Sequence, residues 1–151
     1  MSMFQSMGIT SSALTSQRLR MDVISSNMAN VDTTRGKLVD GQWQPYTRKM
    51  VVMQPKESSF SSIFNSSLQN TGNNKMNGVK VSNIVEDESP YRLVYDPEHP
   101  DANEEGYVQM PNVDPLKEMV DLMSATRSYE ANVTVFNASK SMYIKALELG
   151  K

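Results

Sequence analysis

Apolar residues recur with helical spacing over the first thirty positions of the chain. A row with a seven-residue period and a companion row run through this segment; they contain Met7, Leu14, Met21 and Met28, and Ile24 and Val31. Thr10 and Gln17 interrupt the companion row. This spacing predicts an amphipathic helix over residues 3–29, which would span ~40 Å at ~1.5 Å per residue.

The last forty residues carry a second pattern of the same kind. Asp114 and Pro115 form a helix start signal, an acidic N-cap followed by proline, and Gly150 is a stop signal. One apolar row is unbroken and contains Leu122, Tyr129, Phe136 and Tyr143. The other contains Met119, Val133 and Leu147 and is interrupted by Thr126 and Lys140, while the stripe is widened at its start by Leu116, Val120 and Met123. We predict a helix of roughly 35 residues, or ~52 Å.

Two long helices at the two ends of one chain indicate a coiled coil, because long heptad patterns are typical of coiled coils and bundles. The polar interruptions would weaken an isolated pair, whereas packing against neighbouring molecules would bury further faces. The segment SSNMANVDTTR at 25–35 ends the first helix in residues that form caps and turns. We therefore expect this helix end to dock on other molecules rather than within its own.

The middle of the chain shows β character and many turn signals. Residues 49–54 (KMVVMQ) suggest an extended segment, and residues 79–85 and 91–95 suggest two strands joined by a turn at 88–90 into a hairpin. The proline-rich stretch 95–115 is expected to be irregular. Residues 60–64 (FSSIF) read as a short apolar group and 70–78 (NTGNNKMNG) as a loop.

The predicted fold class is therefore α+β, with long terminal helices and a small, loop-rich β module of about four strands between them. The predicted domains are a helix and turn at 1–36, the β module at 37–111 and the closing helix at 112–151.

Composition excludes several classes of function. The 151 residues carry a net charge of −2 and no basic cluster, which argues against nucleic-acid binding and against a membrane surface. No cysteine is present, so disulfides, thiolate catalysis and cysteine-based metal sites are excluded. No segment has the length and apolarity of a membrane span or of a cleaved signal peptide, so we expect neither membrane insertion nor signal-dependent secretion.

The acidic loop around His99 is the one candidate for chemistry. His99 is the only histidine, and neither a second histidine nor a cysteine is available to complete a zinc or iron site. Residues 101–106 (DANEEG) resemble the start of a calcium loop, but Asn112 stands where a bidentate glutamate is needed. No nucleophile motif or phosphate loop occurs. We expect no catalytic, metal or cofactor site.

Three separated motifs resemble the bacterial flagellar rod and hook proteins. They are residues 11–35, which contain Asn27-Met28-Ala29-Asn30; residues 95–115; and residues 118–151, with RSYEAN at 127–132 in their middle. Met28 stands where isoleucine or leucine is usual in this family. The resemblance covers about two-thirds of the chain and leaves residues 56–78 without a match.

The resemblance implies a structural subunit of the flagellar basal body that polymerises into the proximal rod, transmits torque from the motor to the hook and is needed for motility. Its implied partners are other copies of itself, other rod proteins and the flagellar type III export apparatus, which would carry it across the inner membrane without a cleaved signal. We predict an assembly interface made of Met7, Leu14, Met21, Ile24, Asn27, Asn30, Leu122, Arg127, Tyr129, Asn132, Val133 and Phe136.

Two alternatives remain open from the sequence. The chain could be another rod or hook component, although its short middle argues against the larger distal-rod and hook proteins. It could also be a secreted, soluble adaptor with helical arms, which would be monomeric and folded throughout.

Overall fold

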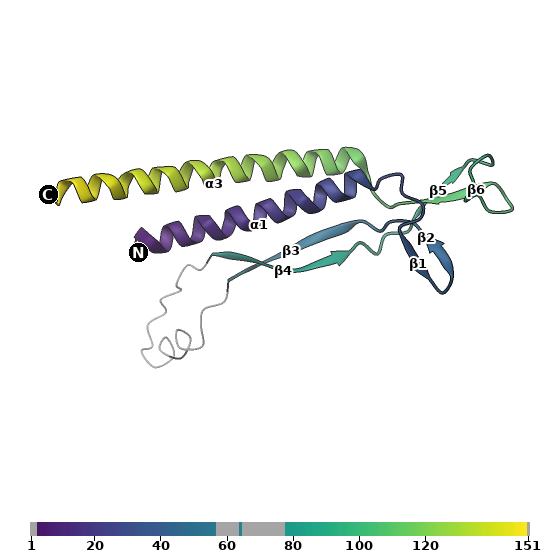
Figure 1. Cartoon of the computed structure of the whole chain (residues 1–151), viewed down its shortest axis with the longest axis horizontal. Helices are drawn as coiled ribbons and strands as arrows, with labels where there is room; N and C mark the ends of the chain where they lie inside the picture. The colour runs from purple at the N-terminus through teal and green to yellow at the C-terminus, as the bar shows by residue number, and fades with distance from the viewer. Residues whose placement is uncertain (1–2, 57–63, 65–77, 151) are drawn as a thin grey trace.

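The computed structural model describes residues 3–56, 64 and 78–150. These residues form an elongated molecule built on two long helices, α1 (Met3–Ala29) and α3 (Pro115–Leu149). Figure 1 shows the helices side by side along the long axis, with both chain termini at one end. The predicted α+β class and the bounds of both helices are confirmed.

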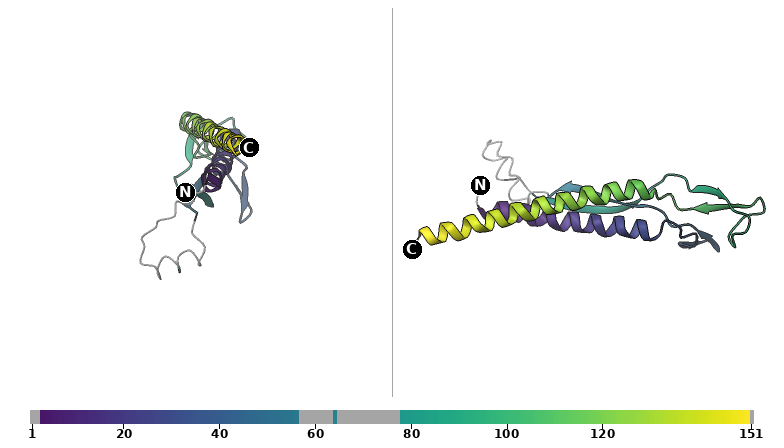
Figure 2. Two further views of the ribbon diagram at one scale, coloured as in Figure 1. Left: turned by 90° about the vertical axis from the view of Figure 1, so that its left-hand side faces the viewer. Right: turned by 90° about the horizontal axis from the view of Figure 1, so that it is seen from above.

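The two helices run antiparallel, so the end of α1 lies beside the start of α3. Figure 2 shows the same pairing from above, with the C-terminal end of α3 extending beyond the start of α1. Arg20 and Asp121 form an ion pair of 3.4 Å across the helices, and Thr126 donates to the Met21 sulfur at 3.6 Å. The interruption at Thr126 thus falls at the contact between the helices, where its hydroxyl also donates to the Leu122 carbonyl.

Local signals account for the helix ends. The Asp114 carboxylate accepts hydrogen bonds from the Leu116 and Lys117 amides, which the first helical turn leaves without intrahelical partners. Gly150 ends α3, and its N–H donates to the Leu147 carbonyl. At the end of α1, the Asn30 side-chain amide donates to the Ser26 carbonyl at 2.8 Å. As the sequence predicts, an asparagine here satisfies a carbonyl of the last turn.

Strands β1 (Lys37–Val39) and β2 (Gln42–Gln44) form a short hairpin beyond the end of α1. Asp40 and Gly41 make its two-residue turn, and both have positive φ, at 50° and 81°. An Asp-Gly turn with two positive φ values matches the right-handed twist of the flanking strands. Sequence reasoning missed this hairpin, although Asp-Gly between extended residues is a strong local signal for one.

Strands β3 (Lys49–Pro55) and β4 (Val79–Glu86) form a longer antiparallel pair that lies along α1. The register shifts between Val52 and Met53, which places a bulge in the ladder. The start of β4 approaches α1 closely, because the Val79 amide donates to the Ser12 hydroxyl at 3.1 Å. At Gly78 an added Cβ would lie 2.0 Å from that oxygen, so the contact requires glycine.

Strands β5 (Arg92–Tyr95) and β6 (Tyr107–Met110) form the third pair, at the end of the molecule opposite the termini. Two predictions are therefore wrong. The segments 79–85 and 91–95 do not pair with each other, because β4 pairs with β3 and β5 pairs with β6. The proline-rich stretch is not wholly irregular, since it contains β6, whose residues are free of proline.

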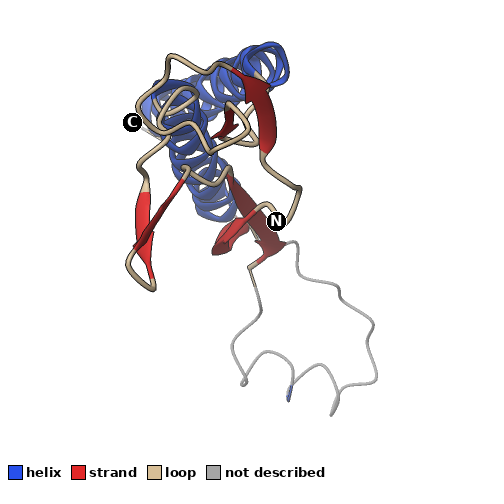
Figure 3. Ribbon diagram, turned by 90° about the vertical axis from the view of Figure 1, so that its right-hand side faces the viewer, coloured by secondary structure: helices blue, strands red, loops and turns tan. Residues whose placement is uncertain are grey.

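The predicted β module of about four strands differs from the observed one in the number and pairing of its strands. Among the described residues, six strands make three separate two-stranded sheets. Figure 3, seen from the hairpin end, shows them as separate groups around the helices rather than as one layer. A pair of strands buries little apolar surface alone, so each pair depends on neighbouring elements. The predictions for 60–64 and 70–78 fall almost entirely outside the described residues.

The apolar core of the described residues is thin. Its buried hydrophobic members are Val23, Ile24, Val108, Val113 and Ala125, whereas the largest fully buried side chains include Glu118 and Asn27. Many large apolar side chains stay exposed, particularly on α3. Neither of the two long helices has the length and apolarity together that crossing a membrane requires.

Candidate functional site

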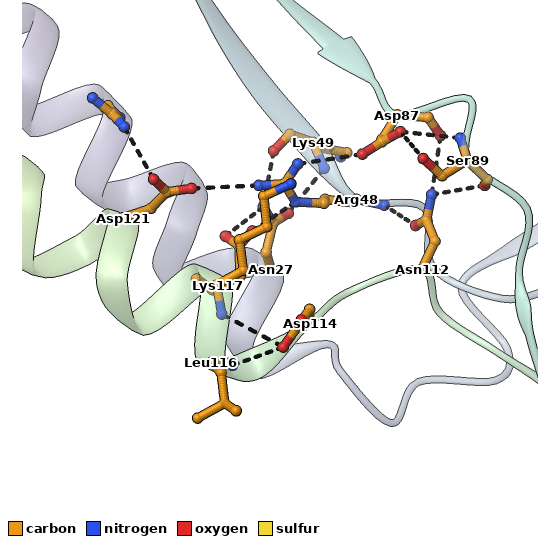
Figure 4. A network of polar contacts seen from close by, with 12 residues as sticks. Asn27, Arg48, Lys49, Asp87, Ser89, Asn112, Asp114, Leu116, Lys117 and Asp121 are labelled. Atoms are coloured by element: carbon orange, nitrogen blue, oxygen red, sulfur yellow. Dashed lines mark hydrogen bonds and ion pairs between the residues drawn. The ribbon is translucent and has the colours of Figure 1, made fainter.

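A buried polar cluster joins the end of α1, the start of α3 and the start of β3. Its centre is Glu118, whose side chain is 0% exposed. One carboxylate oxygen accepts from Arg48 Nε at 2.6 Å, and the other accepts from Asn27 Nδ2 at 3.0 Å. We call the cluster the polar joint; its members are Glu118 and five residues labelled in Figure 4, which are Asn27, Arg48, Asp87, Asn112 and Asp121.

The Asn27 side chain forms all the hydrogen bonds it can make with groups of its own chain. Its Nδ2 donates to Glu118 and to the Lys49 carbonyl, and its Oδ1 accepts from the Lys49 amide and the Tyr46 hydroxyl at 3.0 Å each. A side-chain amide offers two donor hydrogens and one carbonyl oxygen with two lone pairs. Asn27 therefore uses its full capacity to hold β3 and α3 against the end of α1.

Arg48 connects three carboxylates. Besides Glu118, its guanidinium reaches Asp87 at 3.2 Å and Asp121 at 3.5 Å. Burial lowers the pKa of Arg48, but the hydrogen bonds and charges of Glu118 and Asp87 outweigh burial and leave the pKa raised. Arg48 therefore stays charged. Because Asp121 also pairs with Arg20, the three carboxylates of the joint are paired with two arginines, Arg48 and Arg20.

Asn112 and Asp87 extend the joint toward β5 and β6. The Arg48 amide donates to the Asn112 side chain at 2.7 Å, and Asn112 Nδ2 donates to the Asp87 and Ser89 carbonyls. Hydrogen bonds from the Ser89 hydroxyl and amide, assisted by Arg48, lower the pKa of Asp87 despite partial burial. Through these bonds the segment after β4 and the segment before α3 are tied to the start of β3.

Sequence reasoning missed the polar joint because its two charged partners lie far apart in the chain. Glu118 lies four residues before Leu122, so it occupies the same helical face as the apolar row that packs on α1. A charged residue in such a position is a signal for a buried ion pair. Its partner, Arg48, is 70 residues away in the chain. No spacing pattern identifies that residue.

The expectation that the end of α1 docks on other molecules rather than within its own is wrong for Asn27. Its hydrogen bonds all go to residues of the same chain, and only 1% of the residue is exposed. The Asn30 and Asn132 amides likewise donate to carbonyls four residues earlier in their own helices.

The other predicted interface residues lie mostly along the contact between the helices. Ile24 is buried, and Arg127 is exposed. The remaining apolar ones are partly buried; they are Met7, Leu14, Met21, Leu122, Tyr129, Val133 and Phe136. The structure thus brings the two predicted seams together within one chain.

The opposite side of α3 carries an apolar surface that faces solvent. Near the start of the helix its members are Leu116, Met119, Val120 and Met123, which are 74%, 50%, 60% and 54% exposed. Further along α3, Val135 and Met142 are also exposed, at 51% and 57%. Figure 4 shows Leu116 pointing away from the polar joint. We call this surface the outer face of α3.

The acidic loop between β5 and β6 has a structural role. Asp101 accepts from Arg35 Nε and from the Thr34 hydroxyl, each at 2.8 Å, which ties the loop to the segment after α1. The hydrogen bonds from Arg35 and Thr34 lower the pKa of Asp101. The His99 ring nitrogen Nδ1 accepts from the Asp101 amide. Within the described part of the chain, no three acidic, histidine or cysteine residues are grouped as metal ligands.

Comparison with known proteins agrees with this architecture of two terminal helices. The family model "Flagella basal body rod protein" matches residues 7–36, and the model "Flagellar basal body rod FlgEFG protein C-terminal" matches residues 104–149. The chain is 66% identical to the flagellar basal-body rod protein FlgC of Bacillus subtilis over 151 residues, which cover all of both chains.

The chain belongs to the FlgC family of flagellar basal-body rod proteins.

Two further FlgC relatives extend the comparison. The FlgC of Borreliella burgdorferi is 44% identical over 99% of this chain and 98% of its own length. That of Salmonella typhimurium is 46% identical over 95% of this chain and 94% of its own length. As a member of the FlgC family, the protein is a structural component of the basal-body rod rather than an enzyme. The family membership favours the rod over a soluble adaptor.

Proposed function

We propose that this FlgC-family subunit assembles into the proximal rod through the outer face of α3, which packs against helices of neighbouring subunits. The observation that carries the proposal is a row of exposed apolar residues on a helix whose other side is already occupied. Leu116, Val120 and Met123 are spaced by four and three residues and lie on one side of the helix. Large contiguous apolar surfaces mark interaction sites.

The thin core supports the same proposal. A helix pair that buries few apolar residues within its chain gains much of its stability by packing against further helices. The polar joint would hold the two helices and the strands in one orientation, so that torque from the motor passes through a stiff subunit toward the hook. Motility would then depend on this assembly.

The neighbours on the outer face would be other copies of this chain and other rod proteins. We also infer that the chain reaches the rod through the flagellar type III export apparatus. The absence of cysteine from the sequence supports passage in an unfolded state, because refolding after export then requires no oxidation.

The proposal is tested by a substitution that places a charged residue on the outer face of α3. Leu122→Asp, the obvious choice from the sequence, is ambiguous because Leu122 is partly buried inside the subunit. Val120 is 60% exposed, so Val120→Asp should leave the fold intact. We expect a normal unfolding midpoint and normal protein level, but loss of swimming and no rod beyond the membrane ring by electron microscopy.

The matched control is Glu130→Gln, which changes a charge at an exposed position of the same helix. Cells that carry this variant should swim normally. Normal swimming and complete basal bodies with Val120→Asp would overturn the proposal for the outer face. The family assignment would stand in that case.

A further inference from the structure

Two methionines lie in the middle of the outer face of α3. Met119 and Met123 are 50% and 54% exposed, and they are separated by about one turn of the helix. The neighbouring Leu116 and Val120 are 74% and 60% exposed. In the unassembled subunit both thioether side chains are therefore accessible to reagents in solution, within a surface that is otherwise aliphatic.

The other methionines differ from this pair in exposure or in position. Among those whose burial the structure describes, Met142 is also exposed, at 57%, and the rest are partly buried. Met142 lies ~28 Å beyond Met123 along the helix, so it is outside the outer face. Met21 lies between the two helices, where its sulfur already accepts a hydrogen bond from the Thr126 hydroxyl at 3.6 Å.

Exposed thioethers are the groups of this chain that peroxides oxidise most readily, because the sequence has no cysteine. A sulfur lone pair forms the S–O bond, the O–O bond of hydrogen peroxide breaks, and the second oxygen leaves as water. The product is methionine sulfoxide, which is polar. Sulfoxide reductases return it to methionine; a dithiol is oxidised to a disulfide and the oxygen is released as water.

A sulfoxide at either position changes the surface that a neighbouring helix meets. The sulfoxide oxygen is a hydrogen-bond acceptor, and the side chains of Leu116 and Val120 on the same side of α3 offer no donor. Burial of an acceptor without a partner costs free energy and therefore opposes association. Because Met119 and Met123 are about one turn apart, two oxidations place two such acceptors in the centre of one apolar surface.

We propose that Met119 and Met123 form a reversible modification site, at which oxidation by a peroxide blocks packing of the outer face and enzymatic reduction restores it. The inference rests on the proposed role of the outer face and adds a chemical modification that regulates it. Packing against a neighbouring helix removes both sulfurs from solvent, so assembly protects them. Oxidation therefore acts on subunits that have not yet been assembled.

The order of oxidation is measured on the purified full-length protein after a limited dose of hydrogen peroxide. Digestion with trypsin gives residues 118–127 (EMVDLMSATR), which contain both methionines of the site and no other. Mass spectrometry should show Met119 and Met123 oxidised about fivefold faster than Met21, because they are more exposed. Their rate should be close to that of Met142. Sulfoxide reductase with a dithiol should return the 118–127 peptide to its original mass.

Two matched double variants connect oxidation to assembly. Glutamine is close to a sulfoxide in size and polarity, whereas leucine keeps the surface apolar and takes up no oxygen. We expect Met119→Gln with Met123→Gln to keep a normal unfolding midpoint, to bind a hydrophobic-interaction column more weakly and to abolish rod formation in cells. Met119→Leu with Met123→Leu should support normal swimming, and after a peroxide pulse its cells should form more new basal bodies than wild-type cells.

Equal oxidation rates for Met119, Met123 and Met21 would overturn the site, as would equal peroxide sensitivity of wild-type cells and cells with the double leucine variant. Normal swimming with the double glutamine variant, while Val120→Asp cells lack rods, would overturn the inference and leave the role of the outer face intact. Normal swimming with Val120→Asp would overturn that role and the inference with it. Circular dichroism on every variant shows whether the fold is retained.

Discussion

Arg48 Nε donates to Glu118 Oε1 over 2.6 Å, and this pair ties the start of β3 to the first turn of α3 inside the molecule. The Glu118 side chain is 0% exposed and that of Arg48 is 9% exposed. A buried charge is tolerated only when it is paired and hydrogen-bonded. The pair therefore sets the positions of the two elements relative to each other.

Removing one partner should destabilise the subunit strongly. Glu118→Ala leaves the Arg48 guanidinium buried without its closest anion, so we expect the free energy of unfolding to fall by ~3–5 kcal/mol. Urea denaturation followed by circular dichroism measures the change. The double variant Glu118→Leu with Arg48→Met should recover most of the loss, because no unpaired charge remains.

The exposed pair of Lys145 and Glu148 serves as the control for this experiment. Their side chains are 77% and 56% exposed, and Glu148→Ala should change the free energy of unfolding by less than ~1 kcal/mol. If Glu118→Ala behaved like Glu148→Ala, the buried pair would not hold the fold as described.

Replacing the Asn27 side-chain amide by a carboxylate of the same shape should destabilise the subunit. Asn27→Asp replaces the Nδ2 donor, 3.0 Å from Glu118 and 2.8 Å from the Lys49 carbonyl, by an acceptor. Two buried acceptors then lose their donor, and two carboxylates face each other. We expect a loss of at least ~2 kcal/mol, measured by the same denaturation experiment.

Asn30→Asp is the matched control, since the Asn30 side-chain amide donates to the Ser26 carbonyl of its own helix. Its effect should be small. Equal losses for the two variants would mean that the cost arises at the helix end in general and not in the polar joint.

Glycine should be required where β4 meets α1. Gly78→Ala places a Cβ 2.0 Å from the Ser12 oxygen, so we expect the variant to lower the unfolding midpoint. Ser12→Ala in the same protein should restore part of the stability by removing that oxygen. Differential scanning calorimetry measures both changes.

Gly8→Ala provides the opposite case on the same helix. A Cβ at Gly8 meets nothing within 4 Å, and alanine favours the helix over glycine by ~1 kcal/mol. This variant should raise the midpoint of unfolding. A Gly78→Ala protein as stable as wild type would contradict the close approach of β4 to α1.

The contact of Arg35 with Asp101 should be sensitive to acid. The pKa of Asp101 is lowered, so the stabilising interaction is complete above the ordinary aspartate pKa of ~3.9 and is lost as pH falls through the lowered value. Titration of the Asp101 carboxyl carbon by NMR should show the lowered pKa in the wild type. In Arg35→Gln the pKa should rise toward its ordinary value.

Asp101→Asn identifies the Asp101 signal in this titration. An Asp101 pKa that Arg35→Gln leaves unchanged would show that Arg35 does not hold the loop between β5 and β6.

Secondary structure followed from local patterns in much of this chain. The bounds of α1 and α3 were predictable because heptad spacing, the Asp114 cap, Pro115 and Gly150 all act over a few neighbouring residues. Extended segments at 49–54 and 79–85 were predictable from their β-branched and methionine-rich composition. The wrong hairpin prediction arose because two adjacent strands were assumed to pair, whereas β4 pairs with an earlier strand.

The sequence by itself determined the α+β class, the two long helices and, through its motifs, the flagellar rod family. The tertiary structure decided which side of each helix is occupied. It showed that the seam containing Leu122 is used within the subunit and that Val120 on the outer face is not. It also placed Arg48 beside Glu118, because a pair separated by 70 residues is brought together only by the packing of complete elements.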